Sequence, residues 1–139
     1  MRIAIVASDY APTVGGVQIA VHNIAHHAAR QGHAVAVLSH QSPGSRVHEL
    51  EGDIPIHRFP WGRRPVLTLP FRALWTLIAM ARVLRQFKPD LVYIHFLSIN
   101  ALYVLMLHYA MNFKLVTSAR GNDIQGIPTR SRLQRWMLT

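Results

Sequence analysis

The chain alternates between short apolar runs and longer segments in which apolar residues recur every three or four positions. Short, nearly all-apolar runs are typical of parallel strands that are buried on both faces. Four segments fit that description: Arg2–Ser8, Ala34–Ser39, Asp90–Phe96 and Lys114–Ala119. The three- and four-residue spacing predicts helices between the strands, over about Val17–Gln31, Pro70–Phe87, Ala101–Asn112 and from Thr129 onward. This order predicts an α/β fold built on a parallel sheet.

Two segments in the middle of the chain have weaker patterns. Ile54–Phe59 alternates like a half-exposed strand, and Pro55 near its start places it at an edge of the sheet. Val47–Asp53 holds three of the six acidic residues, and we expect a solvated surface segment with little chemistry. In the helix predicted over 70–87, the expected buried stripe is Leu74, Leu77, Ile78, Ala81 and Leu84, and a basic outer face carries Arg82, Arg85 and Lys88.

A pair of glycines, Gly15 and Gly16, lies between the first predicted strand and the first predicted helix. Glycine can adopt a positive φ or let another group approach the backbone. The first turn of a helix adds unpaired N–H groups and the positive end of the helix dipole. The junction therefore predicts an anion site suited to a phosphate. The alternative is a plain turn, since the dinucleotide and P-loop signatures are both missing.

Polar residues also follow two of the predicted strands. In open parallel sheets, ligands bind beyond the carboxyl ends of the strands. His95 ends one strand and is either placed for chemistry or a hydrogen-bonded structural residue. Arg120–Asp123 follows the strand that begins at Lys114, and Gly121 permits a sharp turn there. Asp90 lies at the opposite edge, where we expect a turn or cap residue.

Two short motifs carry a family resemblance. Asp9–Gln18 reads DYAPTVGGVQ, and Gly32–Leu38 reads GHAVAVL. Together they resemble the N-terminal half of a family 4 glycosyltransferase, one of the retaining enzymes with the two-domain GT-B fold. The resemblance implies a Rossmann-like parallel sheet with helices on both faces. It also implies one truncated N-terminal domain over residues 1–139, with the C-terminal nucleotide-sugar-binding domain absent from this chain.

The resemblance also assigns candidate site residues. In that family the glycine loop lies near the diphosphate of a sugar nucleotide, which implies donor contacts for Gly15, Gly16 and Gln18. Catalytic roles are implied for His95 and Asp123, and acceptor contacts for Asp9, Tyr10, Thr13, Arg120 and Asn122. Arg120 stands where the family commonly has a histidine, and it provides a fixed cation suited to phosphate or carboxylate instead of a proton-transfer group.

The implied reaction moves a sugar from a nucleotide-sugar to a carbohydrate or lipid-linked acceptor, with retention. Helix dipoles and N–H groups can stabilise the leaving diphosphate without a metal, and the chain has no Asp-x-Asp pair to hold a divalent ion. His22 and His26 lie four positions apart on the first helix, but we expect no acid or cysteine to join them. The sequence therefore predicts no cofactor and no metal site.

The amino-acid composition narrows the range of possible binding partners. Fifteen Lys and Arg against six Asp and Glu give a formal net charge of +9, which favours an anionic partner. Besides the sugar nucleotide, an anionic membrane surface fits, with peripheral contact through the loop and helix that carry Trp61, Arg63, Arg64, Phe71 and Trp75. The chain has no nucleic-acid motif with interleaved aromatics, so we do not expect nucleic acid as a partner.

Several features of the sequence indicate where in the cell the protein is located. No segment reaches the roughly 20 apolar residues of a membrane span, and the first residues are expected to form a strand, not a signal peptide. The absence of cysteine gives no sign of an oxidising compartment. We therefore expect a cytoplasmic protein, peripheral to the inner face of the membrane.

Two rival functions stay open at this level. One is a non-catalytic phosphate- or nucleotide-binding module, and the other is a basic membrane-docking domain. If the chain is half of a transferase, the isolated chain is expected to be inactive and the parent protein to be the enzyme.

Overall fold

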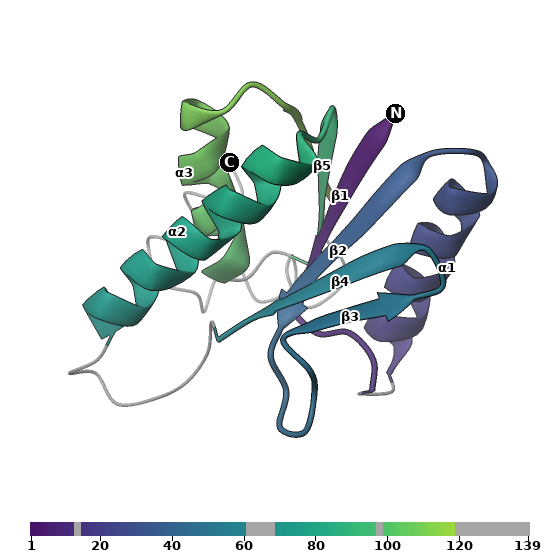
Figure 1. Cartoon of the computed structure of the whole chain (residues 1–139), viewed down its shortest axis with the longest axis horizontal. Helices are drawn as coiled ribbons and strands as arrows, with labels where there is room; N and C mark the ends of the chain where they lie inside the picture. Colours follow the sequence, from purple (N-terminus) through teal and green to yellow (C-terminus); the bar gives the residue numbers. More distant parts are fainter. Residues whose placement is uncertain (13–14, 61–68, 97–98, 119–139) are drawn as a thin grey trace, which may run out of the picture.

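A computed structural model of the chain describes residues 1–12, 15–60, 69–96 and 99–118 (Figure 1). The predicted helix from Thr129, the loop that carries Trp61, and the segment Arg120–Asp123 lie outside these residues. The described elements, in chain order, are β1 (Arg2–Ala7), α1 (Gly16–Arg30), β2 (Ala34–His40), β3 (His48–Glu51), β4 (Ile54–Phe59), α2 (Leu69–Phe87), β5 (Leu91–His95), α3 (Ile99–Ala110) and β6 (Lys114–Ser118).

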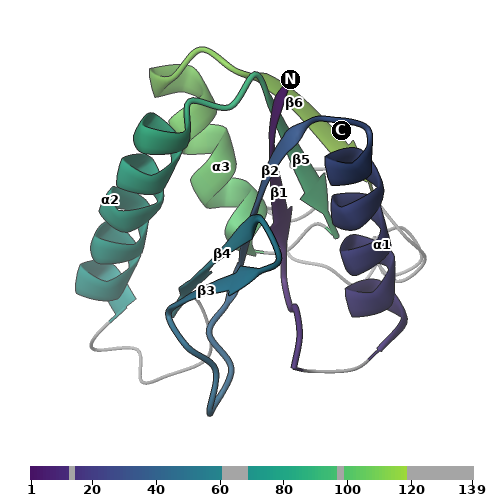
Figure 2. The ribbon, with the colours of Figure 1, turned by 45° about the vertical axis from the view of Figure 1, so that its right-hand side comes forward.

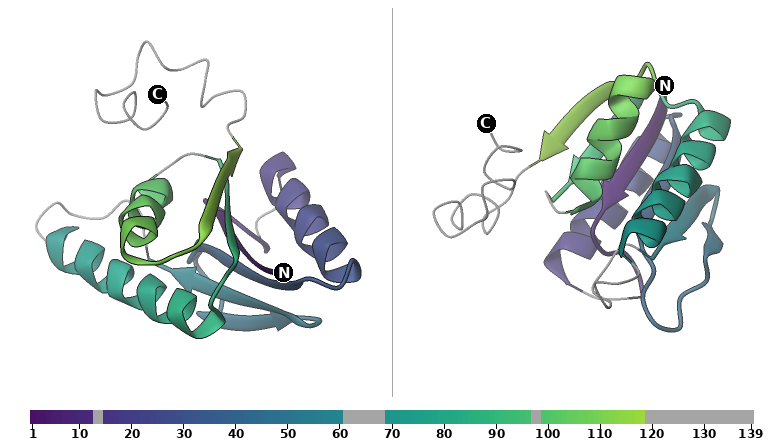
Figure 3. Two further views of the ribbon diagram at one scale, coloured as in Figure 1. Left: turned by 90° about the horizontal axis from the view of Figure 1, so that it is seen from above. Right: turned by 90° about the vertical axis from the view of Figure 1, so that its left-hand side faces the viewer.

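The described strands form one sheet in the order β3-β4-β2-β1-β5-β6. All neighbours are parallel except β3 and β4, which pair antiparallel. Helix α1 lies on one side of the sheet, and α2 and α3 lie on the other (Figure 2 and Figure 3, left). The predicted α/β class with helices on both faces is confirmed.

Alternation along the strands produces two apolar cores. Ile5 and Ala7 of β1 pack toward α1, with Val21 and Ala25 of that helix. Ala4 and Val6 lie in the cluster on the opposite face, which α2 and α3 cover. Because β1 is buried on both faces, its sequence has no polar position between Ile3 and Ala7.

A glycine ends α1. Gly32 has a φ of 82°, in the left-handed region that favours glycine. Its N–H donates to the carbonyl of Ala29 at 2.9 Å, and the His33 N–H donates to the carbonyl of Ala28 at 3.2 Å. These bonds satisfy two carbonyls of the last turn and direct the chain into β2.

The sequence prediction is wrong about the sheet edge. Ile54–Phe59 was expected at the edge, but β4 lies between β2 and β3. Pro55 is tolerated because pairing with β2 begins only at Ile56, so the missing N–H falls before that ladder. The true edge is β3, within the segment that was expected to be simply solvated. Its polar sequence, HELE, has no apolar pattern that would predict a strand.

The buried face of α2 also differs from the predicted stripe. Ala81 and Leu84 are buried as expected, but Leu74 is 57% exposed and Ile78 is 44% exposed. Met80 and Thr76 point to the core instead. Because α2 carries apolar residues around most of its circumference near its start, spacing could not select which side faces the sheet.

Candidate functional site

The strand order creates a topological switch point at β1. The chain continues from β1 to β2 on one side, whereas β5 pairs with β1 on the other side. Such points leave a crevice at the carboxyl ends of the two strands, where α/β proteins bind ligands. Here the switch point lies at the end of β1, at Ala7, which is in register with His95 of β5.

The start of α1 faces this edge of the sheet. Gly15 is the N-cap residue, with an extended backbone (φ −172°), and its carbonyl accepts the Ile19 N–H at 3.0 Å. A glycine cap offers no side-chain oxygen to the first N–H groups of the helix, so these groups are available to an anion.

The two glycines have different surroundings. A methyl group added at Gly15 would meet the side-chain oxygen of Gln18 at 2.5 Å, whereas one added at Gly16 would meet no atom within 4 Å. Neither glycine has a positive φ. The backbone conformation at these two positions therefore does not require glycine, and the space beside Gly16 is available for an approaching group.

His95 lies at the predicted edge but is fully buried. Its Nδ1 lies 3.1 Å from the hydroxyl of Tyr93, two positions earlier on the same strand. Phe96 follows with a φ of 73°, an unusual conformation for a bulky residue. Strained residues of this kind gather at functional sites. The complete burial of the His95 ring favours a structural role, which is one of the two roles that the sequence left open for this residue.

A buried arginine holds the loop between β1 and α1. The side chain of Arg58 is 1% exposed and forms an ion pair with Glu49, Nη1 to Oε2, at 2.8 Å. The same nitrogen donates to the carbonyl of Arg46 at 2.9 Å, and Nη2 donates to the carbonyl of Ala11 at 2.7 Å. One guanidinium therefore joins three segments of the chain.

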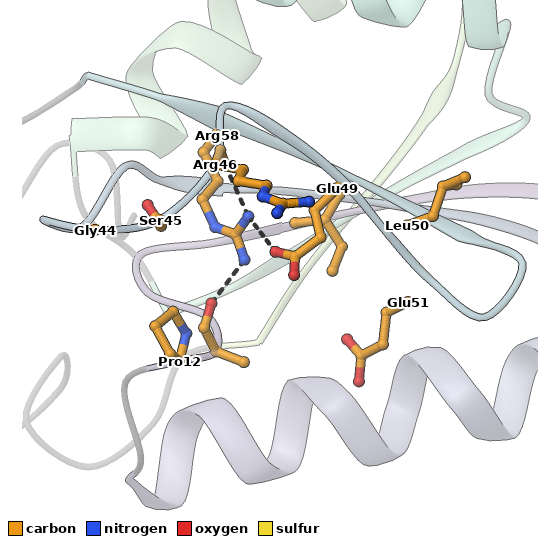
Figure 4. A pocket seen from close by; sticks show the side chains of 10 residues that line it. Pro12, Gly44, Ser45, Arg46, Glu49, Leu50, Glu51 and Arg58 are labelled. Atoms are coloured by element: carbon orange, nitrogen blue, oxygen red, sulfur yellow. Dashed lines mark hydrogen bonds and ion pairs between the residues drawn. The ribbon is translucent and has the colours of Figure 1, made fainter.

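This arginine lines a cavity of about 600 Å³. Figure 4 shows Arg58 between Glu49 and the loop that carries Pro12, with Arg46 and Ser45 close by. The cavity combines two guanidinium groups with acidic and backbone groups. Its polar walls come from the loop after β2, from the edge strand β3 and from the loop after β1.

A second polar cluster joins the β1–α1 loop, α1 and β3. The hydroxyl of Tyr10 donates to Oε2 of Glu51 at 2.8 Å. Oε1 of Glu51 lies 2.9 Å from Nδ1 of His22 and 3.3 Å from Nε2 of His26. The expectation that no acid joins the two histidines is therefore wrong, because pairing of β3 with β4 brings Glu51 to them.

Burial and neighbouring groups shift the pKa values of Tyr10 and Glu51 in this cluster. Burial of the Tyr10 hydroxyl and its bond to Glu51 raise the pKa of the phenol well above its usual range. Burial opposes ionisation of Glu51, but the hydrogen bonds from Tyr10 and His26 and the charges of both histidines outweigh it, so the pKa of the carboxyl lies below its ordinary value. At neutral pH, Tyr10 is a donor and Glu51 is an anion.

The structure places some predicted site residues and leaves others outside the described chain. Gly15, Gly16 and Gln18 lie together at the start of α1, and Asp9 is half-buried after β1. Tyr10 is only 1% exposed and its hydroxyl donates to Glu51, and its predicted acceptor contact stays a prediction. The residues outside the described ranges are Thr13, Arg120, Asn122 and Asp123.

Asp90 has the structural role that its position predicts. Its Oδ2 accepts the backbone N–H of Arg2 at 2.7 Å, and its own N–H donates to the carbonyl of Arg2 at 2.8 Å. It therefore fixes the amino ends of β1 and β5, far from the switch point.

Comparison with known proteins identifies the class. Residues 15–139 match the model of the glycosyl transferase 4-like domain, and the chain belongs to this family of glycosyltransferase domains. Its fold is the N-terminal half of the GT-B fold, which its solved neighbours share.

Individual relatives agree with this assignment. A GDP-mannose-dependent alpha-mannosyltransferase of Mycobacterium tuberculosis is 35% identical over 97 residues, covering 68% of this chain and 25% of that protein. The enzyme of the same name from Mycolicibacterium smegmatis is 36% identical over 100 residues, covering 68% of this chain and 25% of that protein. The chain thus spans about a quarter of the length of these relatives.

Solved structures support the fold. Sucrose-phosphate synthase from Thermosynechococcus elongatus aligns over 99% of this chain and 39% of that chain, with a TM-score of 0.78 and 14% identity. MurG from Acinetobacter baumannii aligns over 89% of this chain and 38% of that chain, with a TM-score of 0.54 and 19% identity. In the described ranges of the present chain, no helix combines the length and apolarity that crossing a bilayer requires.

Proposed function

We propose that this domain forms one side of the active site of a retaining glycosyltransferase, which moves a sugar from a nucleotide-sugar to a carbohydrate or lipid-linked acceptor. The observation that carries the proposal is the start of α1. Its first N–H groups lack a side-chain cap, and the space beside Gly16 is open next to the switch point. A leaving diphosphate is stabilised by such groups without a bound metal.

Residue roles follow from this placement. Gly15, Gly16 and Gln18 contact the donor diphosphate, and Asp123 is the candidate group at the reacting centre. His95 is buried behind the edge, so we assign it the role of positioning the carboxyl end of β5. The remaining proposed acceptor contacts are Asp9, Thr13, Arg120 and Asn122.

The relatives suggest the donor. Both mannosyltransferases described above are named as GDP-mannose-dependent, so we propose GDP-mannose as the donor. Because the present chain matches about a quarter of each, we propose that transfer requires a second domain that contributes most nucleotide contacts. The 139 residues alone are then inactive, and the complete cytoplasmic protein is the enzyme.

The experiment is an assay of the protein that contains this domain together with its second domain. GDP release from GDP-mannose is measured with and without a panel of carbohydrate and lipid-linked acceptors, alongside UDP-glucose as a donor control. Acceptor-dependent GDP release supports the proposal. Binding of the nucleotide-sugar without transfer to any acceptor would instead support a non-catalytic nucleotide-binding module.

We also propose that α2 contacts an anionic membrane. Phe71, Leu74, Trp75 and Ile78 are exposed by 80%, 57%, 57% and 44%, and their spacing puts them on one face of the helix. Arg82 and Arg85 continue the same helical face and are also exposed. Apolar side chains beside basic ones are typical of helices that bind the surface of a bilayer.

Vesicle sedimentation tests this contact. The protein is expected to sediment with vesicles that contain anionic lipid, and salt is expected to release it because the surface attraction is screened. Replacing Phe71 and Trp75 by Ala reduces the bound fraction, whereas Ile19→Ala, which changes an exposed apolar residue on α1, leaves it unchanged. Absence of sedimentation at low salt would exclude the proposed contact.

A further inference from the structure

The cluster of Tyr10, His22, His26 and Glu51 has a composition that the transferase chemistry does not use. His22 and His26 are four residues apart on α1, so both rings stand on one face of the helix, with their centroids 4.2 Å apart. Glu51 reaches them from β3, and Figure 4 shows its carboxylate directed toward α1.

We propose that His22, His26 and Glu51 bind a divalent transition-metal ion of the Zn²⁺ type. One ligand atom from each residue lies within 4.8 Å of the other two. Two imidazole nitrogens and one carboxylate oxygen form a ligand set that Zn²⁺ accepts with a fourth position open. Mg²⁺ and Ca²⁺ are disfavoured because they prefer oxygen ligands.

The distances suit this ion. With bonds of about 2.0–2.1 Å, neighbouring ligands of a tetrahedral Zn²⁺ lie about 3.3–3.4 Å apart. The separations from Glu51 Oε1 are 2.9 Å to His22 Nδ1 and 3.3 Å to His26 Nε2. One of these separations matches the tetrahedral spacing, the other is slightly shorter, and the two histidine nitrogens lie within 4.8 Å of each other.

The surroundings favour a metal site over a simple hydrogen-bonded cluster. Tyr10 donates to Oε2 of Glu51, which orients the carboxylate and leaves Oε1 facing the histidines. Partners of this kind orient ligands in metal sites. The side chains of His22, His26 and Glu51 are 44%, 30% and 30% exposed, so an ion has access and water can fill the fourth position.

Metal binding would reinforce the packing of α1 against the edge of the sheet. The ion would join α1 to the edge strand β3, beside the loop that carries Tyr10. Because the ligands must be deprotonated, binding releases any proton that the histidines hold and weakens as the pH falls. The site is separate from the start of α1, so the proposed transfer does not depend on it.

The test uses the full chain, freed of metal by a chelator and titrated with ZnCl₂ in a calorimeter. We expect one ion per chain. His26→Gln and Glu51→Gln should each weaken binding by more than about 100-fold, since loss of an outer-shell partner alone costs about 10- to 100-fold. Tyr10→Phe, which removes only such a partner, should weaken it by about tenfold.

Matched controls separate this site from general histidine binding. His27→Gln changes an exposed histidine on the same helix, and His48→Gln changes one member of the histidine pair on the β3–β4 hairpin. Both should keep the affinity of the wild type. If either control loses as much affinity as His26→Gln, or if no binding at one ion per chain is found, the proposal is wrong.

A spectroscopic measurement on the unaltered chain does not depend on the folding of variants. Co²⁺ in a four-coordinate site gives strong visible absorption, whereas hexahydrated Co²⁺ absorbs weakly. We expect the strong bands on addition of CoCl₂ and their loss on addition of ZnCl₂. A spectrum identical to that of aqueous Co²⁺ would overturn the proposed ligand set.

Discussion

Arg58 is the residue on which the shape of the polar cavity depends most. Its guanidinium is buried, and its partners belong to the loop after β1, the loop after β2 and the edge strand β3. Removal of the arginine would leave two backbone carbonyls and a half-exposed carboxylate without this partner. These hydrogen bonds are part-buried, and acceptors that lose their donor away from water destabilise a fold by more than the hydrogen bond itself contributes.

We therefore predict that Arg58→Met lowers the free energy of unfolding by about 2–4 kcal/mol. Arg58→Lys should recover less than half of the loss, because one ammonium group cannot span three acceptors as a planar guanidinium does. Urea denaturation measures the free energy of unfolding of both variants. The control Arg85→Met removes an exposed arginine of α2, and an effect of equal size there would contradict this account.

Some of this residue-level detail was accessible from the sequence. Ile54, Ile56 and Arg58 alternate along β4, so Arg58 shares the face of two buried residues. A charged residue in that register, near the acids Glu49 and Glu51, indicates a buried ion pair. The partners themselves could not be predicted, because they depend on how β3 folds back on β4 and on the path of the loop after β1.

The same hairpin carries a pair of histidines. Nδ1 of His48 and Nδ1 of His57 lie 3.0 Å apart across the two strands. Burial, and then the charge of His48, lower the pKa of His57 below its ordinary value of 6.5. The folded state thus disfavours protonation of His57, whereas the unfolded chain takes up the proton at the ordinary pKa.

The sign of the pH effect follows directly. Well above pH 6.5 the His57 ring is neutral in both the folded and the unfolded state, so its full contribution to stability is present. As the pH falls below that value, the unfolded chain takes up the proton first, so stability decreases until the pH passes the lower folded pKa. We predict that His57→Gln makes the free energy of unfolding less dependent on pH between about 7 and 5. An unchanged slope in urea titrations across that range would contradict the shift.

At the scale of elements, apolar periodicity predicted most of the fold. The described helices and the strands β1, β2, β5 and β6 follow from runs and spacings that are visible in the chain. Strand β3 could not be predicted because its residues have no apolar pattern, and the partners of its acidic side chains come from distant parts of the chain. The contact of Glu51 with His22 and His26 was missed for the same reason, since Glu51 reaches them only through that strand.

At the scale of the whole molecule, the fold gathers its proposed chemistry at one edge of the sheet. The start of α1, the end of β5 and the polar cavity come from segments far apart in the sequence. The roles of Gly15, Gly16 and Gln18 come from the family resemblance, and their arrangement is compatible with those roles. The roles of Thr13, Arg120, Asn122 and Asp123 stay predictions.

The central claim is that the start of α1 holds the diphosphate of a nucleotide-sugar, and Gly16→Ala tests it most directly. A methyl group there meets no protein atom within 4 Å, and Gly16 has no positive φ that alanine would strain. The variant is therefore expected to fold with an undiminished melting temperature, so that any loss of activity reports on an approaching ligand.

The measurement is the KM for GDP-mannose in the complete two-domain protein, for the wild type, Gly16→Ala and the control Asn23→Ala, which alters an exposed position further along α1. We predict a KM at least about tenfold higher for Gly16→Ala, equivalent to about 1.4 kcal/mol of lost binding, with Asn23→Ala unchanged. A Gly16→Ala enzyme with the KM and kcat of the wild type would place the diphosphate elsewhere.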